Sequence, residues 1–290
     1  MINKLKIACL MVTYNRSHLL HKILSQIQSF SWDYSRFVIV NNASHDDTSE
    51  ILLELMDSLG LEVISLPENL GHGAGLAQGL RMLNETGEKI DYVVFLEDDS
   101  IPQKGYLDFL TEAIKLHSFT MISSGGYLVR LGKRINLSPQ EGEILDVDFG
   151  LFDGAIAKFK DLMKVGFPVE DWFMMFDDFE YCYRIRKAGY KIGVIHNPYL
   201  GILHEGWGGG SSYSHLWRSY YQSRNFILFV RKHLTLFTFW DALILNSKRL
   251  LGGLFSKNGW RVTKLRLLGY RAGFLGKTGK SLDLKTLKEF

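Results

Sequence analysis

The sequence predicts an α/β fold, in which a mostly parallel sheet is flanked by helices and followed by a helical, basic C-terminal extension. Short apolar runs alternate with amphipathic segments over about the first 100 residues, which is the pattern of repeated strand and helix units. Polar and acidic residues directly follow these runs, as they do at the ligand-binding edge of an open parallel sheet. From Lys248 onward eleven Lys and Arg stand against two acids, so this part carries +9 and the preceding residues −6. We expect a main domain over residues 1–217 and an extension over residues 218–290.

The first strand is expected over residues 6–13, KIACLMVT, because this run is almost wholly apolar. Residues 17–30 follow with leucines and isoleucines at helical spacing, so a helix is expected there. Between them, Tyr14, Asn15 and Arg16 fall at the carboxyl end of the strand. These residues could hold a nucleotide base, or they could form an ordinary turn between a strand and a helix.

A second strand over residues 37–40 runs into the polar segment NNASHDDTSE, and another helix follows. Asp47 or Thr48 can cap that helix, so part of the polar run has a structural explanation. Asn41 and Asn42 do not belong to the cap and lie where an open sheet binds its ligands.

A third strand is expected over residues 61–66, and the segment PENLGHGAGLAQGLRML then passes through a glycine-rich turn into a helix. Gly71, Gly73 and Gly75 would let the backbone approach a phosphate or ribose at the helix amino terminus. This spacing differs from the GxGxxG fingerprint of dinucleotide-binding proteins, so the glycines alone are weak evidence for a ligand.

The fourth apolar run, residues 92–96, ends abruptly at Glu97, Asp98 and Asp99. Because side chains alternate faces along a strand, we expect Glu97 and Asp99 to point into one crevice and Asp98 to point to the other side. Two carboxylates at the carboxyl end of a strand suit a Mg²⁺ or Mn²⁺ ion that also holds phosphate. The alternative is a charged turn that binds nothing.

In the middle of the chain we expect a helix over residues 106–116, a strand over 120–129, a polar mobile loop over 133–143 and a strand over 191–195. Residues 147–157 combine Phe and Asp with small residues, where a sugar could lie against the sheet or a turn could pack closely.

A second cluster joins aromatic residues to acids in WFMMFDDFEY, residues 172–181, just before the basic segment YCYRIRKAGY. Asp177 and Asp178 would begin this helix, so one of them can cap it while the other faces the crevice. A carboxylate set among aromatic rings is partly desolvated, which raises its pKa and suits it to act as a general base. Farther on, LHEGWGGGSS carries His204, a candidate metal ligand, and Trp207, in a glycine-rich flap that could order over a substrate.

A chain of 290 residues with 46% hydrophobic content can bury a full core. Its two cysteines, Cys9 and Cys182, lie in apolar segments without CxxC spacing, which indicates neither a disulfide framework nor a zinc site and favours a cytoplasmic protein. The opening MINKLKIACLMVTYNR lacks a small-residue cleavage site, so we expect it to form a strand and not a signal peptide.

Residues 226–246 are the most membrane-like stretch, but Arg, Lys, His and Asp interrupt them, so no membrane-spanning helix is expected. Residues 226–251 mix Phe, Leu and Trp with basic residues, which suits an amphipathic helix on an anionic lipid surface. A helix packed on the core with a solvated basic face is the alternative. No nucleic-acid recognition motif accompanies the charge, so nucleic acid is not expected as a partner.

Taken in order, the motifs of the chain resemble those of the family 2 glycosyltransferases: VTYNR at 12–16, VNNASHDDT at 40–48, NLGHGAG at 69–75, LEDDS at 96–100, FDDFEY at 176–181 and HEGWGG at 204–209. The resemblance covers roughly residues 5–230 and is closest to the bacterial galactofuranosyl and rhamnosyl transferases. It implies a GT-A fold, a nucleotide-diphospho-sugar donor, a divalent metal ion and inversion at the anomeric carbon.

The resemblance also implies roles for single residues. Asp178 matches the catalytic base of the family, and Asp177 and Glu180 support it. Asp99 stands at the last position of the DxD motif, which binds the metal ion, and His204 matches a histidine that completes the metal site in some members.

Donor contacts follow from the same resemblance. Glu97 stands at the first position of the DxD motif, which usually contacts ribose and is usually Asp. Asn41 stands where the family often has an Asp that reads the base, which leaves both a UDP-sugar, the favoured donor, and a dTDP-sugar open. The remaining residues implied at the donor are Thr13, Tyr14, Arg16, Asn69, Gly71, Asp98 and Trp207.

The implied reaction moves galactofuranose, rhamnose or another hexose to a hydroxyl of a glycan or a polyprenyl-linked oligosaccharide, with the enzyme on the inner face of the cell membrane. A sugar nucleotidyltransferase is one alternative, but it would need a glycine-rich basic loop where this chain has VTYNRSHL. An inactive carbohydrate-binding or scaffold protein on a membrane surface is the other, and the presence of Glu97, Asp99 and Asp178 together argues against it.

Overall fold

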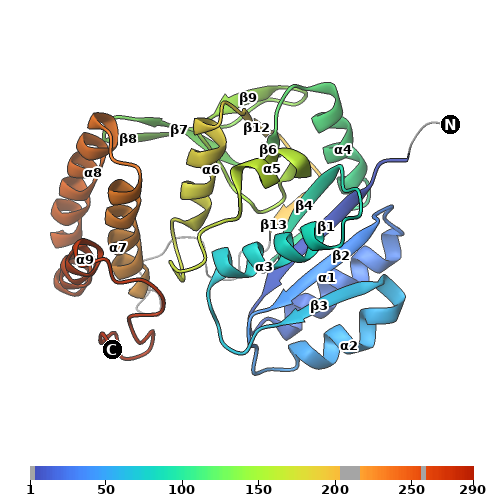
Figure 1. Cartoon of the computed structure of the whole chain (residues 1–290), viewed down its shortest axis with the longest axis horizontal. Coiled ribbons are helices and arrows are strands. Elements are labelled where there is room, and N and C mark those ends of the chain that lie inside the picture. The colour runs from blue at the N-terminus through green and yellow to red at the C-terminus, as the bar shows by residue number, and fades with distance from the viewer. Residues whose placement is uncertain (1–3, 203–215, 256–258) are drawn as a thin grey trace.

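An eight-stranded sheet forms the centre of the computed structural model, which describes residues 4–202, 216–255 and 259–290 (Figure 1). Its first four strands in spatial order run parallel to one another, and the inserted strand β11 is antiparallel to both of its neighbours. The α/β fold with a mostly parallel sheet is therefore confirmed. Across the sheet the strands are β3 (Leu61–Ser65), β2 (Arg36–Asn41), β1 (Ile7–Thr13), β4 (Tyr92–Glu97), β11 (Ile156–Lys158), β6 (Met121–Ser123), β12 (Ile192–Ile195) and β9 (Ile144–Val147).

Helices cover both faces of this sheet because its strands are buried on both sides. Along β1, Ile7, Cys9 and Met11 pack against one set of helices, whereas alternate residues such as Leu10 pack against the other set. The first set comprises α1 (Ser17–Phe30), α2 (Thr48–Leu59) and α4 (Tyr106–Leu116), and the second comprises α3 (His72–Glu85), α5 (Phe159–Val165) and α6 (Asp177–Lys187).

The register of the parallel strands brings their carboxyl ends to one edge. Thr13 at the end of β1 pairs with Asn41 of β2, and Val12 pairs with Glu97 of β4. The polar segments that follow these strands therefore meet at the same place, as the sequence predicts.

Two predictions for the middle of the chain are wrong. The strand expected over residues 120–129 is broken, because the chain leaves the main sheet after β6 and re-enters a small second sheet as β7 (Gly126–Arg130). Part of the loop expected over residues 133–143 is a strand, β8 (Lys133–Leu137), which pairs with β7 in a hairpin. The other short strands are β10 (Phe149–Gly150), which pairs with β7, and β5 (Ser100–Pro102) and β13 (Leu200–Ile202), which pair with each other.

The cap predicted for α2 is also wrong in detail. Asp47 makes no side-chain hydrogen bond to the helix, whereas the Oδ1 atom of Asp46 accepts from the backbone N–H and hydroxyl of Thr48. The same carboxylate accepts from the Ser17 backbone N–H through Oδ2, so it joins the starts of α1 and α2.

Three helices follow at one end of the molecule: α7 (Trp217–Lys232), α8 (Leu236–Leu254) and α9 (Gly259–Phe274) (Figure 1). The single helix expected over residues 226–251 is interrupted, because Thr235 and Thr238 form a capping box that starts α8. Phe226 is 1% exposed, so the first part of the expected amphipathic helix is core. None of the helices in the described ranges is long and apolar enough to cross a membrane.

Candidate active site

A pocket of about 310 Å³ lies at the carboxyl ends of β1 and β4, next to the start of α6. One side of it is polar and acidic, and the other side is apolar and aromatic. Its lining residues are Val12, Thr13, Tyr14, Arg16, Asn42, Asn69, His72, Glu97, Asp98, Asp99, Leu151, Phe152, Phe173, Met174, Met175, Phe176, Asp177, Asp178, Trp217 and Leu284. Nine of the residues predicted from the sequence are among them: Thr13, Tyr14, Arg16, Asn69, Glu97, Asp98, Asp99, Asp177 and Asp178.

Asp98 ties the end of β4 to the end of β1. Its Oδ2 atom accepts a hydrogen bond of 2.8 Å from the Thr13 hydroxyl and one of 3.2 Å from the Tyr14 backbone N–H. The expectation that Asp98 points away from Glu97 and Asp99 is wrong, because β4 ends at Glu97 and the chain turns, so strand alternation no longer applies. Burial raises the pKa of Asp98 to about 6, against the opposing effects of Arg16 and the Thr13 hydroxyl.

Several carboxylates crowd this edge. Burial raises the pKa of Glu97 to about 8, and the neighbouring charges of Asp153 and Asp99 add to the effect. Asp99 is 5% exposed, and a cation of this chain, Arg16 Nη2, lies 3.7 Å from its Oδ2 atom. Buried carboxylates gathered at one edge in this way are an environment that a bound cation stabilises.

One atom of this edge fits a metal ligand. The Oδ1 atom of Asp99 is buried and has no hydrogen-bond partner among the described residues, which is unusual for a carboxylate oxygen unless an ion or water binds it. No group of three His, Cys, Asp or Glu side chains within the described ranges is arranged to hold a metal ion. His204, the predicted third ligand, and Trp207 lie outside the described residues.

The glycine-rich turn before α3 is fixed by packing. Asn42 donates from Nδ2 to the Gly71 carbonyl and accepts from the Leu70 backbone N–H. Gly71 has φ +94°, and a Cβ atom on it would meet the Phe173 carbonyl oxygen. The close approach predicted for Gly71 is therefore an approach to the chain itself, and Gly71 is not one of the described residues that line the pocket. Asn42, which the sequence places at the ligand-binding edge without a specific role, is one of the lining residues.

The aromatic wall of the pocket is a strained turn. Phe173, Met175 and Phe176 have φ of 62°, 70° and 72°, a left-handed conformation that residues with a side chain rarely adopt. The side-chain nitrogen of Asn225, from α7, lies 2.7 to 3.0 Å from the carbonyl oxygens of residues 172, 174 and 175. Arg224 donates to the residue 172 carbonyl as well. This pair holds the turn that precedes α6.

Asp177 and Asp178 form the first turn of α6, at the lip of the pocket. Burial raises the pKa of Asp178 to about 7, and the adjacent charge of Asp177 adds to it. Asp178 can therefore exist both ionised and protonated near neutral pH, which a general base requires. Asp177 instead faces His72, with 3.2 Å between Oδ2 and Nδ1.

His72 is a further lining residue that the sequence gave no reason to select. Burial disfavours its charged form, but the hydrogen bond and the charge of Asp177, with smaller effects of Glu97 and Asp178, raise the pKa of His72 to about 9. A positively charged imidazole therefore stands at the amino end of α3, within electrostatic reach of both acidic clusters.

Glu180 does not reach this pocket, which corrects its predicted role beside Asp178. It is 0% exposed and its carboxylate is bound by Arg184, Lys232 and His233. Because consecutive helix residues are rotated by about 100°, a residue two positions after Asp178 points in a nearly opposite direction. The acid at 180 is a structural link between α6 and the end of α7.

Asn41 is also not among the described residues that line the pocket, which weakens its predicted role in reading the base. It is 3% exposed, its Oδ1 atom accepts from the Ser44 backbone N–H and its Nδ2 atom donates to the Ser49 hydroxyl. The amide thus shapes the turn after β2.

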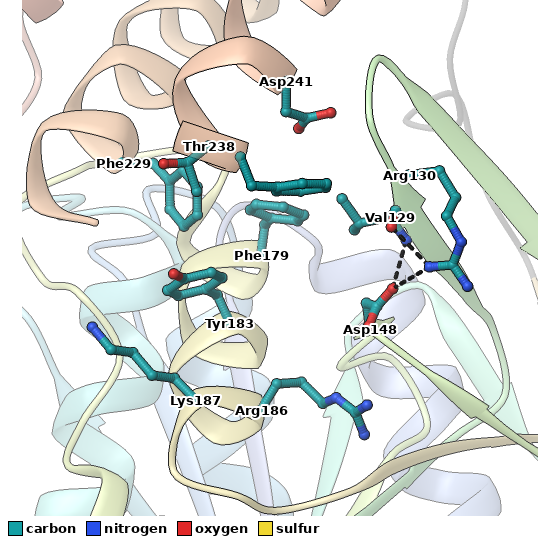
Figure 2. Close-up of a pocket in the computed structure, with 11 residues that line it drawn as sticks. Val129, Arg130, Asp148, Phe179, Tyr183, Arg186, Lys187, Phe229, Thr238 and Asp241 are labelled. Atoms are coloured by element: carbon teal, nitrogen blue, oxygen red, sulfur yellow. Dashed lines mark hydrogen bonds and ion pairs between the residues drawn. The ribbon is translucent and has the colours of Figure 1, made fainter. Parts of the chain in front are cut away.

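Figure 2 shows a second pocket, of about 400 Å³, between α6, the start of α8 and the β7–β8 hairpin. Aromatic rings such as Phe179 and Tyr183 form its centre. Its acids are already paired, Asp148 with Arg130 and Asp241 with Arg134. The groups suited to acid–base chemistry therefore belong to the first pocket.

Comparison with known proteins identifies the sequence family and the fold. The pattern of the family described as Glycosyl transferase family 2 matches residues 8–179. The poly-beta-1,6-N-acetyl-D-glucosamine synthase of Staphylococcus aureus strain COL is 23% identical over 170 residues, which are 59% of this chain and 39% of that protein. The Staphylococcus epidermidis protein of the same name is 23% identical over 156 residues, 54% of this chain and 35% of its own length. The chain thus matches less than half of the length of these relatives.

Similar solved structures cover a larger share of this chain than the sequence relatives do. S. aureus TarS 1–349, crystallised with UDP-GlcNAc, has a TM-score of 0.57 at 19% identity and covers 87% of this chain and 74% of its own. The mannosyltransferase PcManGT from Pyrobaculum calidifontis, in complex with GDP-Man and Mn²⁺, has a TM-score of 0.56 at 15% identity and covers 95% of this chain and 89% of its own. These likenesses confirm the expected GT-A fold with C-terminal helices.

Proposed function

The chain belongs to glycosyl transferase family 2, and from this premise we propose that it transfers a hexose from a nucleotide-diphospho-sugar to a hydroxyl of a glycan acceptor, with inversion and with a divalent metal ion. The observation that carries the proposal is that one pocket gathers Glu97, Asp99 and Asp178 from segments far apart in the chain. A charged turn without a ligand would not explain why these acids share a buried site.

The polar side of the pocket is where we place the donor. Thr13 ends β1, and Tyr14 and Arg16 follow it. Asn69 and His72 flank the turn before α3, and together these residues offer hydroxyl, amide and cationic groups. Arg16 and charged His72 suit a diphosphate, since both can donate hydrogen bonds to phosphate oxygens. The complexes of structural neighbours with UDP-GlcNAc and with GDP-Man support a donor of this class, and a UDP-sugar is favoured over a dTDP-sugar.

Asp99 is the residue that we expect to hold Mn²⁺ or Mg²⁺, because its buried Oδ1 atom has no partner among the described residues. His204 is proposed as a second ligand from the sequence alone. A bound divalent ion would supply Lewis-acid stabilisation of the diphosphate leaving group. The Mn²⁺ in the PcManGT complex supports this choice.

Asp178 is proposed as the general base. It would take the proton of the acceptor hydroxyl while that oxygen attacks the anomeric carbon from the face opposite the diphosphate, so that configuration inverts in one step. Its raised pKa, about 7, places its ionisation near physiological pH. Asp177 stays bound to His72 and so acts on Asp178 only through its charge.

The apolar side of the pocket is proposed for the acceptor. Phe173, Met174, Trp217 and Leu284 lie there, and aromatic rings commonly stack on the apolar faces of sugars. A glycan or a polyprenyl-linked oligosaccharide in the assembly of a cell-surface polysaccharide fits this surface. The similarity to poly-beta-1,6-N-acetyl-D-glucosamine synthases supports this acceptor class. Galactofuranose, rhamnose and N-acetylglucosamine are the donor sugars to be compared first.

The test is a panel of UDP- and dTDP-sugars incubated with Mn²⁺, with release of the nucleoside diphosphate as the readout. We expect turnover with one or a few donors and a loss of about 10²–10⁴-fold in Asp178→Asn. Calorimetric titration should show that this variant still binds the donor. Asp171→Asn is the matched control, because Asp171 is an exposed acid of the same segment that does not line the pocket. Near-normal turnover of Asp178→Asn would refute the base assignment, and no turnover with any donor would favour a carbohydrate-binding protein.

A further inference from the structure

Exposed apolar side chains concentrate in the C-terminal helices. Of the nineteen large apolar residues that are exposed in the described ranges, fourteen lie from Leu234 onward, in about a fifth of the chain. The five others, such as Leu53 and Leu116, are scattered over the rest of the molecule. Scattered exposed leucines are ordinary, whereas a concentration of this kind marks an interaction surface.

On α8 five of the seven exposed large apolar residues form one outward stripe. Leu236, Trp240, Leu243, Leu251 and Leu254 are 48 to 82% exposed, and their spacing places them on a single face of the helix. The usual arrangement is therefore reversed, since a surface helix normally turns its polar face to water.

The inner face of α8 is held by polar contacts. Asp241 is 4% exposed, forms a salt bridge with Arg134 and accepts from the Gly132 backbone N–H of the β7–β8 hairpin. The orientation of α8 is thus fixed by a buried charge pair, and the apolar stripe cannot turn inward without breaking it.

The adjoining helix α9 presents a mixed outward face. Trp260, Leu267 and Phe274 are 74, 51 and 68% exposed, and the exposed cations Lys264 and Arg271 lie between them at helical spacing. Long cationic side chains beside aromatic and aliphatic residues are typical of helices that lie in a membrane interface.

The charge of this region indicates which kind of partner the exposed apolar surface binds. Residues 231–275 contain nine Lys and Arg and a single acid, Asp241, which is buried and paired. A second copy of the chain would bring like charges together, whereas an anionic surface would be attracted.

We propose that the outward faces of α8 and α9 form a docking surface for a membrane that contains anionic lipid. The apolar stripe of α8, with Trp240 and Leu243 at its centre, enters the interface, and Lys264 and Arg271 of α9 meet lipid phosphates. The helices lie in the plane of the membrane. The docked helices are joined to the candidate active site, because α7, which packs along α9, and the chain after α9 supply Trp217 and Leu284 to the pocket. Resting on the proposed function, this places the acceptor side of the site next to the helices that bind the membrane.

The experiment is co-flotation of the full chain with vesicles of phosphatidylcholine that contain or lack 30% phosphatidylglycerol, without donor or acceptor. We expect binding to the anionic vesicles that decreases as salt is raised. Trp240→Glu combined with Leu243→Glu should lower the partition coefficient by about tenfold or more. Lys264→Ser with Arg271→Ser should lower it by about tenfold on anionic vesicles and leave weak binding to neutral vesicles unchanged.

The matched control is Leu53→Glu with Leu116→Glu, which introduces the same charges at exposed leucines of α2 and α4 and should bind vesicles like the unaltered chain. Equal binding of all four proteins, or no binding of the unaltered chain, overturns the proposal. So does self-association of the unaltered chain that only Trp240→Glu with Leu243→Glu abolishes. Donor hydrolysis in solution is measured in parallel. Docking can fail while catalysis persists, and catalysis can fail while docking persists, so the two proposals are tested separately.

Discussion

Replacing Glu180 with Gln tests whether this acid is structural, as its surroundings indicate, or catalytic. Its carboxylate lies 2.9 Å from Arg184 Nε, Lys232 Nζ and His233 Nε2. Gln keeps the size of the side chain and removes its charge. The substitution leaves the cations of α6 and α7 around a neutral group at a position that is 0% exposed.

The size of the expected loss of stability follows from the pKa of Glu180. Burial favours the protonated form, but the hydrogen bond from His233 and the charges of Arg184 and Lys232 lower the pKa from 4.5 to about 2. A difference of this size corresponds to about 3 kcal/mol of folding free energy. Lys232 is 47% exposed, so water screens its share, and we expect Glu180→Gln to cost about 2–3 kcal/mol.

The pH dependence has a definite sign. Because the pKa is lower in the folded chain, the ionised carboxylate stabilises the fold fully above about pH 4.5, and this stabilisation is lost as the pH falls toward 2. The difference in unfolding free energy between the unaltered chain and the variant should therefore be constant from pH 6 to 8 and shrink below about pH 4.5.

The assay is urea unfolding together with donor hydrolysis at 20 °C, with Glu112→Gln on the exposed face of α4 as the control. We expect the unfolding free energy of Glu180→Gln to fall by about 2–3 kcal/mol, which lowers the urea midpoint, and kcat to stay within about threefold. A kcat that falls by about 100-fold with an unchanged unfolding midpoint would refute the reasoning, because it would mean that Glu180 acts in the reaction.

Three further predictions concern the pocket. Because Asp178 must be ionised to accept a proton and its pKa is about 7, kcat/KM should rise with pH up to a plateau above about pH 8, and a flat profile from pH 5.5 to 8.5 would contradict the assignment. Asn225→Leu removes the donor to three carbonyls of the turn before α6, so kcat should fall by about 10-fold or more while circular dichroism stays native; unchanged kcat would show that the turn holds its shape alone. Gly71→Ala should lower the free energy of unfolding in urea by more than about 3 kcal/mol, because its Cβ would overlap the Phe173 carbonyl oxygen. Gly87→Ala, also at positive φ but with nothing within 4 Å, should lower it by about 1 kcal/mol. Equal losses would mean that φ alone explains both.

Much of the fold could be predicted from local pattern. The sequence predicts a first helix over residues 17–30, and α1 has those bounds, because its apolar face repeats at helical spacing and its partner strand is apolar on both faces. Strand β8 cannot be predicted from its own residues, KRINL, because they are mostly polar and partly exposed and are held by the hairpin and by α8, neither of which is visible in the segment itself.

The acidic side of the pocket could also be predicted, since parallel strands bring their carboxyl ends together whatever lies between them in sequence. The two errors among the acids have different causes. Strand alternation does not apply to Asp98, because β4 ends at Glu97. The family resemblance implies a supporting role for Glu180, but its position on α6 turns it away from Asp178. Helical spacing alone separates Glu180 from Asp178, so that error could have been avoided from the sequence.

The apolar side could be predicted only in part: the sequence indicates the aromatic cluster of residues 172–181, but it gives no local signal for the contribution of the chain after residue 216. Trp217 and Leu284 line the pocket, and Asn225 and Arg224 hold the turn that carries its aromatic wall. The three left-handed residues of that turn destabilise it by about 1–3 kcal/mol each. The hydrogen bonds from α7 to the turn stabilise it by about 1–1.5 kcal/mol each, so the two sums are of similar size. This turn therefore keeps its shape only with the hydrogen bonds from α7. Asp178 lies two residues beyond Phe176, the last strained residue, so the position of Asp178 also depends on α7. The predicted division at residue 217 thus separates two parts of the sequence that form one pocket.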